Sequence, residues 1–255
     1  MHKRILHNTI TNNLLTLLRV GAFGISDSDS LVIMSDDKWR RLVSAAEKLQ
    51  ILPYIYTGTT LMSDDKNLSP VLAELLSVKK EEIEKQKDIS YNYSKARLYN
   101  FFTSHRRDGV INEETSNPEI SEDSLILLDI IISILDDMIT KDINIHGLLT
   151  LGLYIRQHNK ELDRQKINNW LSHIGLVQVA SLEGNILIQS FGFSAEELPF
   201  YIKERKNADK ILFSKAEHAF RKHSFSNATR MDIAMLETLS YQFMRGITMI
   251  TDIEE

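Results

Sequence analysis

The run of residues 121–140, SEDSLILLDIIISILDDMIT, is the most apolar stretch of the chain. Its polar residues from position 125 onward are Asp129, Ser133, Asp136, Asp137 and Thr140. All but Asp137 follow one another at intervals of four, three and four residues, which places them in one narrow stripe on a helix. Leaving the other faces in water would cost roughly 1.5 to 3 kcal/mol for each large apolar side chain. Asp129 interrupts the run well before the roughly 18 to 20 apolar residues of a membrane span, so the pattern predicts a buried core helix.

The whole chain predicts an all-α fold, a bundle of about eight or nine helices around this central helix (Ser121 to Thr140). Only four prolines and ten glycines interrupt 255 residues, which leaves long intervals for helices. We expect a single helical domain over residues 1–255. Its sub-parts, 1–108 and 121–255, would be joined by a loop at 109–120, which contains Thr115-Ser-Asn-Pro118.

Capping residues predict where the other helices begin and end. Ser35 and the pair Ser69-Pro70 have the form of helix starts, and Gly175 and Gly192 have the form of helix ends. The capping-box sequence Ser194-Ala-Glu-Glu197 indicates a further start there or at Pro199. Helices are expected at 5–20 (closed by Gly21 and Gly24), 35–50, 70–108, 143–158, 163–174, 176–191 and 229–251.

Two other patterns are weaker. The runs 31–34 and 185–189 have the composition of strands, but both are too short to distinguish a strand from a helix. The pentapeptide MSDDK occurs at Met34 to Lys38 and again at Met62 to Lys66. The residues around the two copies do not match, so shared helix-capping chemistry explains them better than an internal repeat.

The composition and the N-terminal sequence limit the possible cellular compartments and binding partners. The absence of cysteine excludes disulfides, thiol catalysis and cysteine-ligated metals, as is common in a reducing compartment. The N-terminal sequence MHKRILHNTITNN becomes polar where a signal peptide would be apolar. We therefore expect a cytoplasmic protein without a membrane partner. A net charge of −5 argues against a general affinity for nucleic acid.

A glycine turn followed by Asp-x-Asp is the pattern closest to phosphate chemistry. It comprises Gly21, Gly24, Asp27 and Asp29. In nucleotidyl transfer, paired aspartates on a strand hold Mg²⁺ against a triphosphate. Here a predicted helix precedes the glycines and no strand carries the aspartates, which favours a loop with helix-capping aspartates.

Asp129, Asp136 and Asp137 lie on the predicted core helix, where carboxylates can bind metal or act as acid and base. Such a site needs partner ligands on a facing helix, for example Glu-x-x-His, and the sequence has none. A polar stripe that contacts solvent, Arg156 or Lys166 is the better interpretation.

The remaining catalytic motifs are absent. HExxH, Gly-x-Ser-x-Gly and the P-loop do not occur, and His218 and His223 would point in different directions on a helix. We therefore predict no catalytic residue, no metal and no cofactor.

Residues 203–230 contain eight basic and three acidic side chains, with phenylalanines among them. Such a segment could bind phosphates and stack on bases, or it could be an amphipathic helix with a basic outer face. The candidate anion-binding patch comprises Lys203, Arg205, Lys206, Lys210, Arg221 and Lys222.

Two segments resemble the helical parts of a family of bacterial nucleotidyltransferases. Leu14 to Gly58, which includes SDDKWRRLVSAAEKLQILPYIYTG, is similar to the family's N-terminal helical region. Ile145 to Phe200, which ends in GFSAEELPF, is similar to its C-terminal helices, and ARLYNFF falls where its connecting helix would be. The resemblance covers more than half of the chain.

The resemblance also has departures. In such relatives a sheet domain with glycine and Asp-x-Asp motifs lies between the helical parts, whereas this chain has only the short segment 109–120 there. Where the family tends to show Arg-Gln and then Asp-Trp, this chain has His146-Gly147 and Thr150-Leu151. The resemblance therefore implies a helical scaffold without the catalytic domain, and no catalytic residue is carried over.

Three functions remain. The sequence predicts a non-catalytic helical binding or accessory module, with a protein as its partner. One alternative is a divergent nucleotidyltransferase-like enzyme that uses the carboxylates of residues 129–137. The other is a nucleic-acid-binding module that uses residues 203–230.

Overall fold

The computed structural model of the chain describes residues 9–25, 31–87, 91–93, 98, 101–117, 119–140, 144–204 and 208. Contacts divide the chain into two compact units, Met1–Phe220 and Arg221–Glu255, and every described residue belongs to the first. The predicted helix at 229–251 and the pair Asp27 and Asp29 lie outside the described residues. The prediction of one domain over residues 1–255 therefore stays a prediction.

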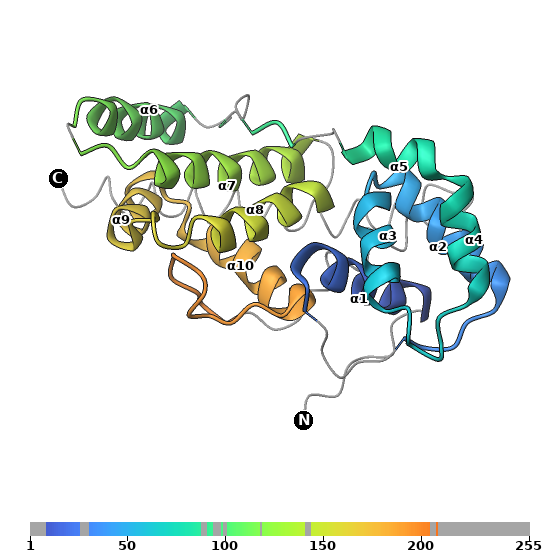
Figure 1. The fold of residues 1–255 in the computed structure, drawn as a ribbon. Helices are drawn as coiled ribbons and strands as arrows, with labels where there is room; N and C mark the ends of the chain where they lie inside the picture. Colours follow the sequence, from blue (N-terminus) through green and yellow to red (C-terminus); the bar gives the residue numbers. More distant parts are fainter. Residues whose placement is uncertain are drawn as a thin grey trace. The chain divides into compact units, whose positions relative to one another are not determined.

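The described part of the chain is helical and contains no strand, which confirms the all-α prediction (Figure 1). The number of helices is slightly larger than the predicted eight or nine. They are α1 (Thr9–Phe23), α2 (Asp36–Lys48), α3 (Leu52–Leu61), α4 (Pro70–Val78), α5 (Lys80–Lys87), α6 (Phe101–Thr115), α7 (Glu122–Thr140), α8 (Ile145–Gln157), α9 (Arg164–Ile174) and α10 (Val177–Phe191). None of them combines the length and the hydrophobicity that a membrane span requires.

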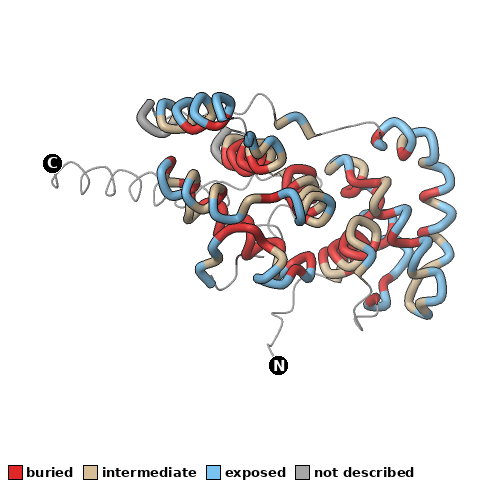
Figure 2. Tube along the Cα trace, turned by 60° about the vertical axis from the view of Figure 1, so that its left-hand side comes forward, coloured by how far each residue is buried: buried red, intermediate tan, exposed pale blue. Residues whose placement is uncertain are grey.

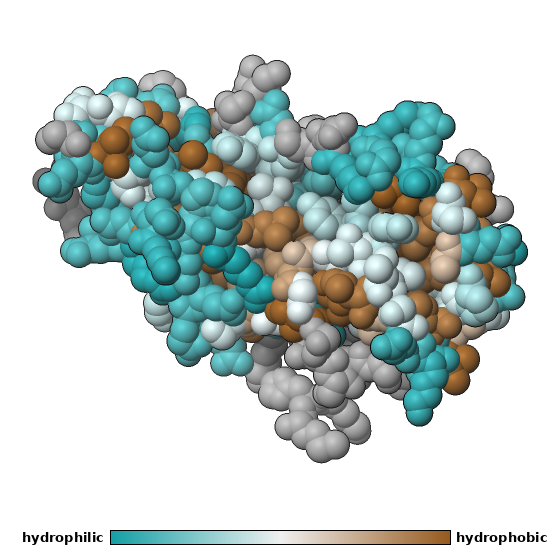
Figure 3. All heavy atoms as spheres, viewed as in Figure 1, coloured by the Kyte–Doolittle hydropathy of each residue, from teal (hydrophilic) through white to brown (hydrophobic). Residues whose placement is uncertain are grey.

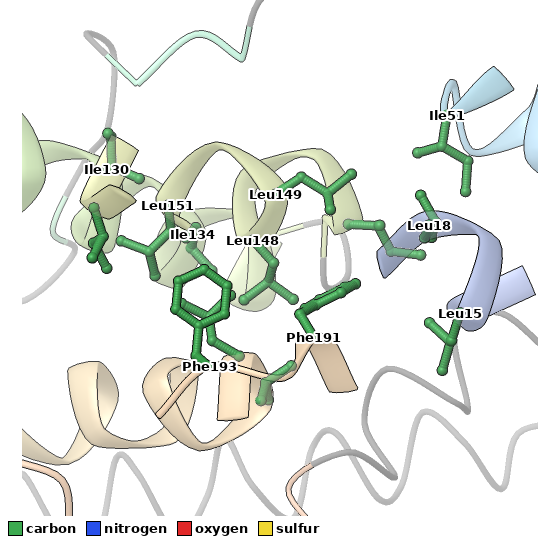
Figure 4. Packing of buried hydrophobic residues seen from close by; sticks show 14 of the residues in the cluster. Leu15, Leu18, Ile51, Ile130, Ile134, Leu148, Leu149, Leu151, Phe191 and Phe193 are labelled. Atoms are coloured by element: carbon green, nitrogen blue, oxygen red, sulfur yellow. The ribbon is translucent and has the colours of Figure 1, made fainter. Parts of the chain in front are cut away.

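The predicted core helix is present as α7. Its residues from Leu127 to Leu135 are buried apart from Asp129, and it packs against α8, α9 and α10. Ile134 of α7, Leu148 of α8 and Phe193 point toward one another in this part of the core (Figure 4). Buried residues gather where the helices face one another, and exposed residues lie on their outer sides (Figure 2). Burial of the apolar face thus positions α7, as the sequence predicted.

α1 and α3 form the most intimate helix pair in the described residues, because two glycines let their backbones touch. A Cβ atom at Gly21 would lie 1.9 Å from the Tyr54 carbonyl oxygen, and one at Gly58 would lie 2.2 Å from that of Leu17. The prediction that Gly21 closes the first helix is therefore wrong. α1 continues to Phe23, and Gly24 follows it with a φ of +66°.

The single helix predicted over 70–108 is also wrong. α4 ends at Val78 and α5 begins at Lys80, while residues 91–93 are not helical. The polar segment is only partly solvated, because Gln86 is buried and its side-chain oxygen accepts a hydrogen bond from the Leu52 amide at 3.2 Å. This bond fixes α5 against the start of α3.

The loop predicted at 109–120 is mostly helical. α6 continues through Gly109 to Thr115, so only the short segment after Thr115 connects it to α7. Val110 and Glu114 are buried, and Lys166 of α9 donates a hydrogen bond to the Glu114 carboxylate at 2.6 Å. These contacts outweigh the roughly 1 kcal/mol that a glycine costs inside a helix.

Most of the predicted helix caps are present. Ser69 caps α4, and Gly175 and Gly192 adopt left-handed conformations after α9 and α10, whereas Ser35 precedes α2 without a side-chain cap bond. Asp163, predicted as the first residue of its helix, is instead the cap of α9 and accepts hydrogen bonds from its first amides. The capping box at 194–197 also forms, since Ser194 donates its amide to Glu197 and the Glu197 amide returns a bond to the Ser194 hydroxyl. No helix follows it or Pro199 within the described residues.

Sequence-distant helices share one core. The Phe23 ring at the end of α1 lies 5.5 Å from that of Phe191 and 5.1 Å from that of Phe193. The Arg156 guanidinium of α8 lies over the rings of Phe23 and Phe193, and it forms an ion pair with Glu197 at 3.0 Å. The N-terminal and C-terminal helices of the described part are thus packed together.

Candidate protein-binding surface

The carboxylates of α7 have separate surroundings. Asp129 forms an ion pair with Arg107 of α6, with an Nη2–Oδ1 distance of 2.7 Å, rather than with the expected Arg156 or Lys166. Asp137 lies two turns further on, where it accepts hydrogen bonds from the Tyr91 hydroxyl and the Asn144 side chain, each at 3.0 Å. The structure therefore does not bring these two carboxylates together.

Asp136 is half-buried. Its side chain leaves the helix in a different direction from that of its neighbour Asp137, because successive helical residues are rotated by about 100°. Within the described residues, no three histidine or acidic side chains are grouped so that they could hold a metal ion.

Only one residue of the candidate anion-binding patch belongs to the described part. Lys203 has an exposed side chain, and its backbone is fixed to α10, where its amide donates to the Ser181 hydroxyl and its carbonyl oxygen accepts from Asn185. Arg205, Lys206, Lys210, Arg221 and Lys222 lie outside the described residues.

A buried carboxyl group in α10 was not identified from the sequence. Glu183 is fully buried, and neither of its carboxyl oxygens has a hydrogen-bond partner in the described part of the chain. Burial raises the pKa of Glu183 well above its usual range, so its neutral form is favoured. The one sequence signal was a glutamate within the otherwise uncharged helix VQVASLEGNILIQSF.

Glu183 and Asp137 influence the same phenol. Burial raises the pKa of Tyr91 well above its ordinary value, and the Asp137 carboxylate, which accepts a hydrogen bond from the Tyr91 hydroxyl, acts in the same direction, as does Glu183 when it is ionised. Ser133 of α7 hydrogen-bonds to this hydroxyl as well. The result is a polar cluster of the half-buried Tyr91 with the buried Asp137 and Glu183. Because the hydrogen bonds of Tyr91 and Asp137 are to protein groups, we regard the cluster as a structural feature.

A shallow acidic hollow lies between the start of α7 and the start of α9. It is lined by Glu119, Ile120, Ser121, Glu122, Asp123, Glu161, Asp163 and Lys166. Several of its carboxylates already have protein partners. Asp123 binds the Tyr154 hydroxyl at 2.7 Å and His158 Nδ1 at 2.8 Å, and burial together with Asp123 raises the pKa of Tyr154. Asp163 caps α9. These bonds join the ends of helices, which is a structural role.

The outer face of α3 has a different character. The helix, LPYIYTGTTL, carries no charged residue, yet its side opposite α1 is exposed. We define the α3 face by the four exposed positions of the helix, Tyr56, Thr57, Thr60 and Leu61, which fall in two adjacent pairs about one helical turn apart. Figure 3 shows pale and brown atoms over this part of the molecule, with hydrophilic areas beside them.

The two threonine hydroxyl groups of the α3 face bond to the backbone of the helix itself. Thr57 donates to the Pro53 carbonyl oxygen and Thr60 donates to that of Tyr56, both at 3.0 Å, so the threonine methyl groups remain to face solvent. Leu61 is 61% exposed and Tyr56 is 46% exposed. Val32 and Ile33, in the extended segment before α2, add two further exposed aliphatic side chains. Exposed apolar groups that gather in this way mark interaction surfaces.

A scan against protein-family models, a search of curated proteins and a search of solved structures found no match to this chain.

Proposed function

We propose that this chain is a non-catalytic helical module that binds another protein through the α3 face. The observation that carries the proposal is an exposed helix surface without a single charged side chain in α3. Surface helices ordinarily carry charged residues on their solvent side. The face consists of a tyrosine, a leucine and two threonines whose hydroxyls donate hydrogen bonds within the helix, so its desolvation costs little free energy. This favours its burial against a second protein.

The chemistry of the α3 face favours a protein over a nucleic acid. Nucleic-acid binding depends on cationic side chains that neutralise phosphates, and α3 has none. Aromatic and aliphatic side chains, in contrast, are typical anchors of protein–protein interfaces. A cytoplasmic location and descent from the helical scaffold of a nucleotidyltransferase are parts of the proposal that rest on the sequence alone.

A photo-crosslinking amino acid at Thr60 tests the proposal. Thr60 is an exposed residue of the α3 face, next to Leu61. The full-length variant, expressed in cells and irradiated, is expected to give a discrete adduct of higher mass, which Leu61→Asp removes by placing a charge in the interface. Glu84 of α5 is the control position because it is exposed and lies on a charged helix.

Equal adducts from positions 60 and 84, or an adduct from position 60 that persists in the Leu61→Asp variant, would contradict the proposal. The circular dichroism spectrum and the melting temperature of Leu61→Asp should equal those of the wild type, since Leu61 is exposed.

The two alternatives stay predictions. Nothing in the surroundings of Asp129, Asp136 and Asp137 favours an enzyme over a structural role, because the contacts of Asp129 and Asp137 are to protein groups. The segment 203–230 lies almost entirely outside the described residues.

A further inference from the structure

A branched aliphatic residue precedes the MSDDK pentapeptide in both copies, so the repeated unit is a hexapeptide. Residues 33–38 are I-M-S-D-D-K and residues 61–66 are L-M-S-D-D-K. Each copy begins with an exposed aliphatic side chain, since Ile33 is 76% exposed and Leu61 is 61% exposed. The methionine that follows packs against the core in both copies, and the serine after it is exposed.

Helix capping does not explain the second copy. The first copy precedes α2, although Ser35 makes no side-chain cap bond. The second copy follows the end of α3 and does not begin a helix, because α4 starts only at Pro70 with Ser69 as its cap. The shared capping chemistry that the sequence suggested is therefore wrong for residues 62–66.

The structure holds the residues directly before the first copy against the second copy and the residue after it. The Asp65 carboxylate accepts a hydrogen bond from the Leu31 amide at 2.9 Å, and Asn67 donates to the Leu31 carbonyl oxygen at 2.6 Å. Asn13 of α1 holds the next residue, Val32, through its amide and its carbonyl oxygen. The chain before α2 consequently runs beside the chain after α3 (Figure 1).

The direction of α3 places Leu61 in the same region. Gly58 approaches Leu17 while Gly21 approaches Tyr54, so α1 and α3 are antiparallel. The last residues of α3 therefore lie toward the Asn13 end of α1, which is the end that binds Val32. Ile33, the residue after Val32, therefore extends the α3 face beyond Leu61 at this end.

Exposed carboxylates follow both aliphatic residues in the sequence. Asp36 and Asp37 follow Ile33, and Asp64 follows Leu61; all three are exposed. Each hexapeptide also carries one lysine, so that each has a net charge of −1. Because side chains of Asn13, Asp65 and Asn67 bond the backbone of residues 31 and 32, this surface is ordered before any partner arrives.

We propose that the paired hexapeptides, residues 33–38 and 61–66, bind a basic amphipathic helix of the partner protein. Aliphatic side chains of that helix would cover Ile33 and Leu61, and its lysines or arginines would pair with Asp37 and Asp64. Charge complementarity selects this occupant, since apolar side chains bordered by carboxylates match an apolar stripe bordered by cations. The inference rests on the proposed function and names the chemistry of its partner.

The acidic hollow provides the matched control. It carries more carboxylates than the paired hexapeptides, but Ile120, at 38% exposure, is its one exposed large aliphatic side chain. A ligand that responds to negative charge alone would bind there as well. A ligand that needs aliphatic contacts and charge together would favour the paired hexapeptides.

The test uses the full-length chain and three fluorescent peptides, with binding measured by anisotropy. One peptide is an amphipathic helix of leucine and lysine, the second replaces every lysine by glutamate, and the third contains the residues of the first in scrambled order.

We expect the leucine–lysine peptide to bind most tightly. The variant Ile33→Ser/Leu61→Ser should weaken its binding about tenfold or more. Asp37→Asn/Asp64→Asn should weaken it about three- to tenfold and reduce its dependence on salt.

Three outcomes would overturn the inference. The glutamate or the scrambled peptide could bind as tightly as the leucine–lysine peptide. The control variant Glu119→Gln/Glu122→Gln could weaken binding as much as the aspartate variant, which would show a response to charge alone. Self-association abolished by Leu61→Ser, without peptide binding, would identify a second copy of the chain as the occupant. In each of these cases a specific adduct at position 60 would leave the proposed function intact.

Discussion

Glu183 predicts an unusual dependence of stability on pH. Its pKa in the folded protein is raised by burial, whereas the unfolded chain has the ordinary value of about 4.3. Between these two values the folded state binds more protons than the unfolded state, so the free energy of unfolding falls as pH rises. Glu183→Gln removes this loss. As pH rises inside that window, the free energy of unfolding of the variant relative to that of the wild type should increase by about 1.4 kcal/mol for each pH unit.

Urea denaturation of both proteins at pH 5 and pH 8 measures this difference. Glu84→Gln is the control, because Glu84 is exposed on α5. A stability difference between Glu183→Gln and the wild type that is the same at both pH values would show that Glu183 is charged in the folded protein.

Capping residues were the positions that the sequence predicted best. Ser69, Gly175 and Gly192 act through bonds or backbone angles within a few residues of themselves, so the local sequence contains the whole cause. The ion-pair partner of Asp129 could not be predicted in this way. Arg107 is 22 positions earlier in the chain and contacts Asp129 only because α6 lies beside α7.

At the scale of helices, the contact between α1 and α3 predicts which glycines tolerate a side chain. Gly21→Ala and Gly58→Ala place a methyl group against backbone atoms that cannot move away by themselves. Each should lower the free energy of unfolding by about 1–3 kcal/mol or more. Gly109→Ala is the matched control, since a Cβ atom there meets no atom within 4 Å. It should raise stability by about 0.5–1 kcal/mol because alanine favours the helix.

Thermal and urea unfolding, followed by circular dichroism, measure all three glycine variants. A loss at Gly109 similar to the losses at Gly21 and Gly58 would mean that the effect comes from helix preference and not from the close approach of two backbones.

The lengths of helices were predicted less well than their existence. α7 is apolar on most of its circumference, so its pattern determined both its helical state and its burial. α5 and α6 had weak apolar faces. Their boundaries depend on contacts such as Gln86 with Leu52 and Lys166 with Glu114, which join residues 34 and 52 positions apart. The uncharged sequence of α3 was visible, but which side faces solvent follows only from its packing on α1.

At the scale of the whole molecule, the shared core predicts that the described helices unfold together. The two tryptophans are placed to test this. Trp39 is buried in α2, and Trp170 is partly buried in α9. The single-tryptophan variants Trp39→Phe and Trp170→Phe should each show the same urea midpoint by fluorescence and by circular dichroism, because Phe23, Phe191 and Arg156 connect the two groups of helices.

Fluorescence that changes at a lower urea concentration than the helical signal, in either variant, would indicate that residues 1–108 and the later helices are separate cooperative units. Buffer with an equal concentration of a non-denaturing solute is the control for direct effects on tryptophan emission.

The contact of Gly58 with the Leu17 backbone also determines how α3 can meet another molecule. A helix that touches its neighbour main chain to main chain has little room to roll or slide, so the backbone beneath its outer face is held in one position. Docking on that face would therefore require little rearrangement of the α3 backbone, and little of its configurational entropy would be lost on binding.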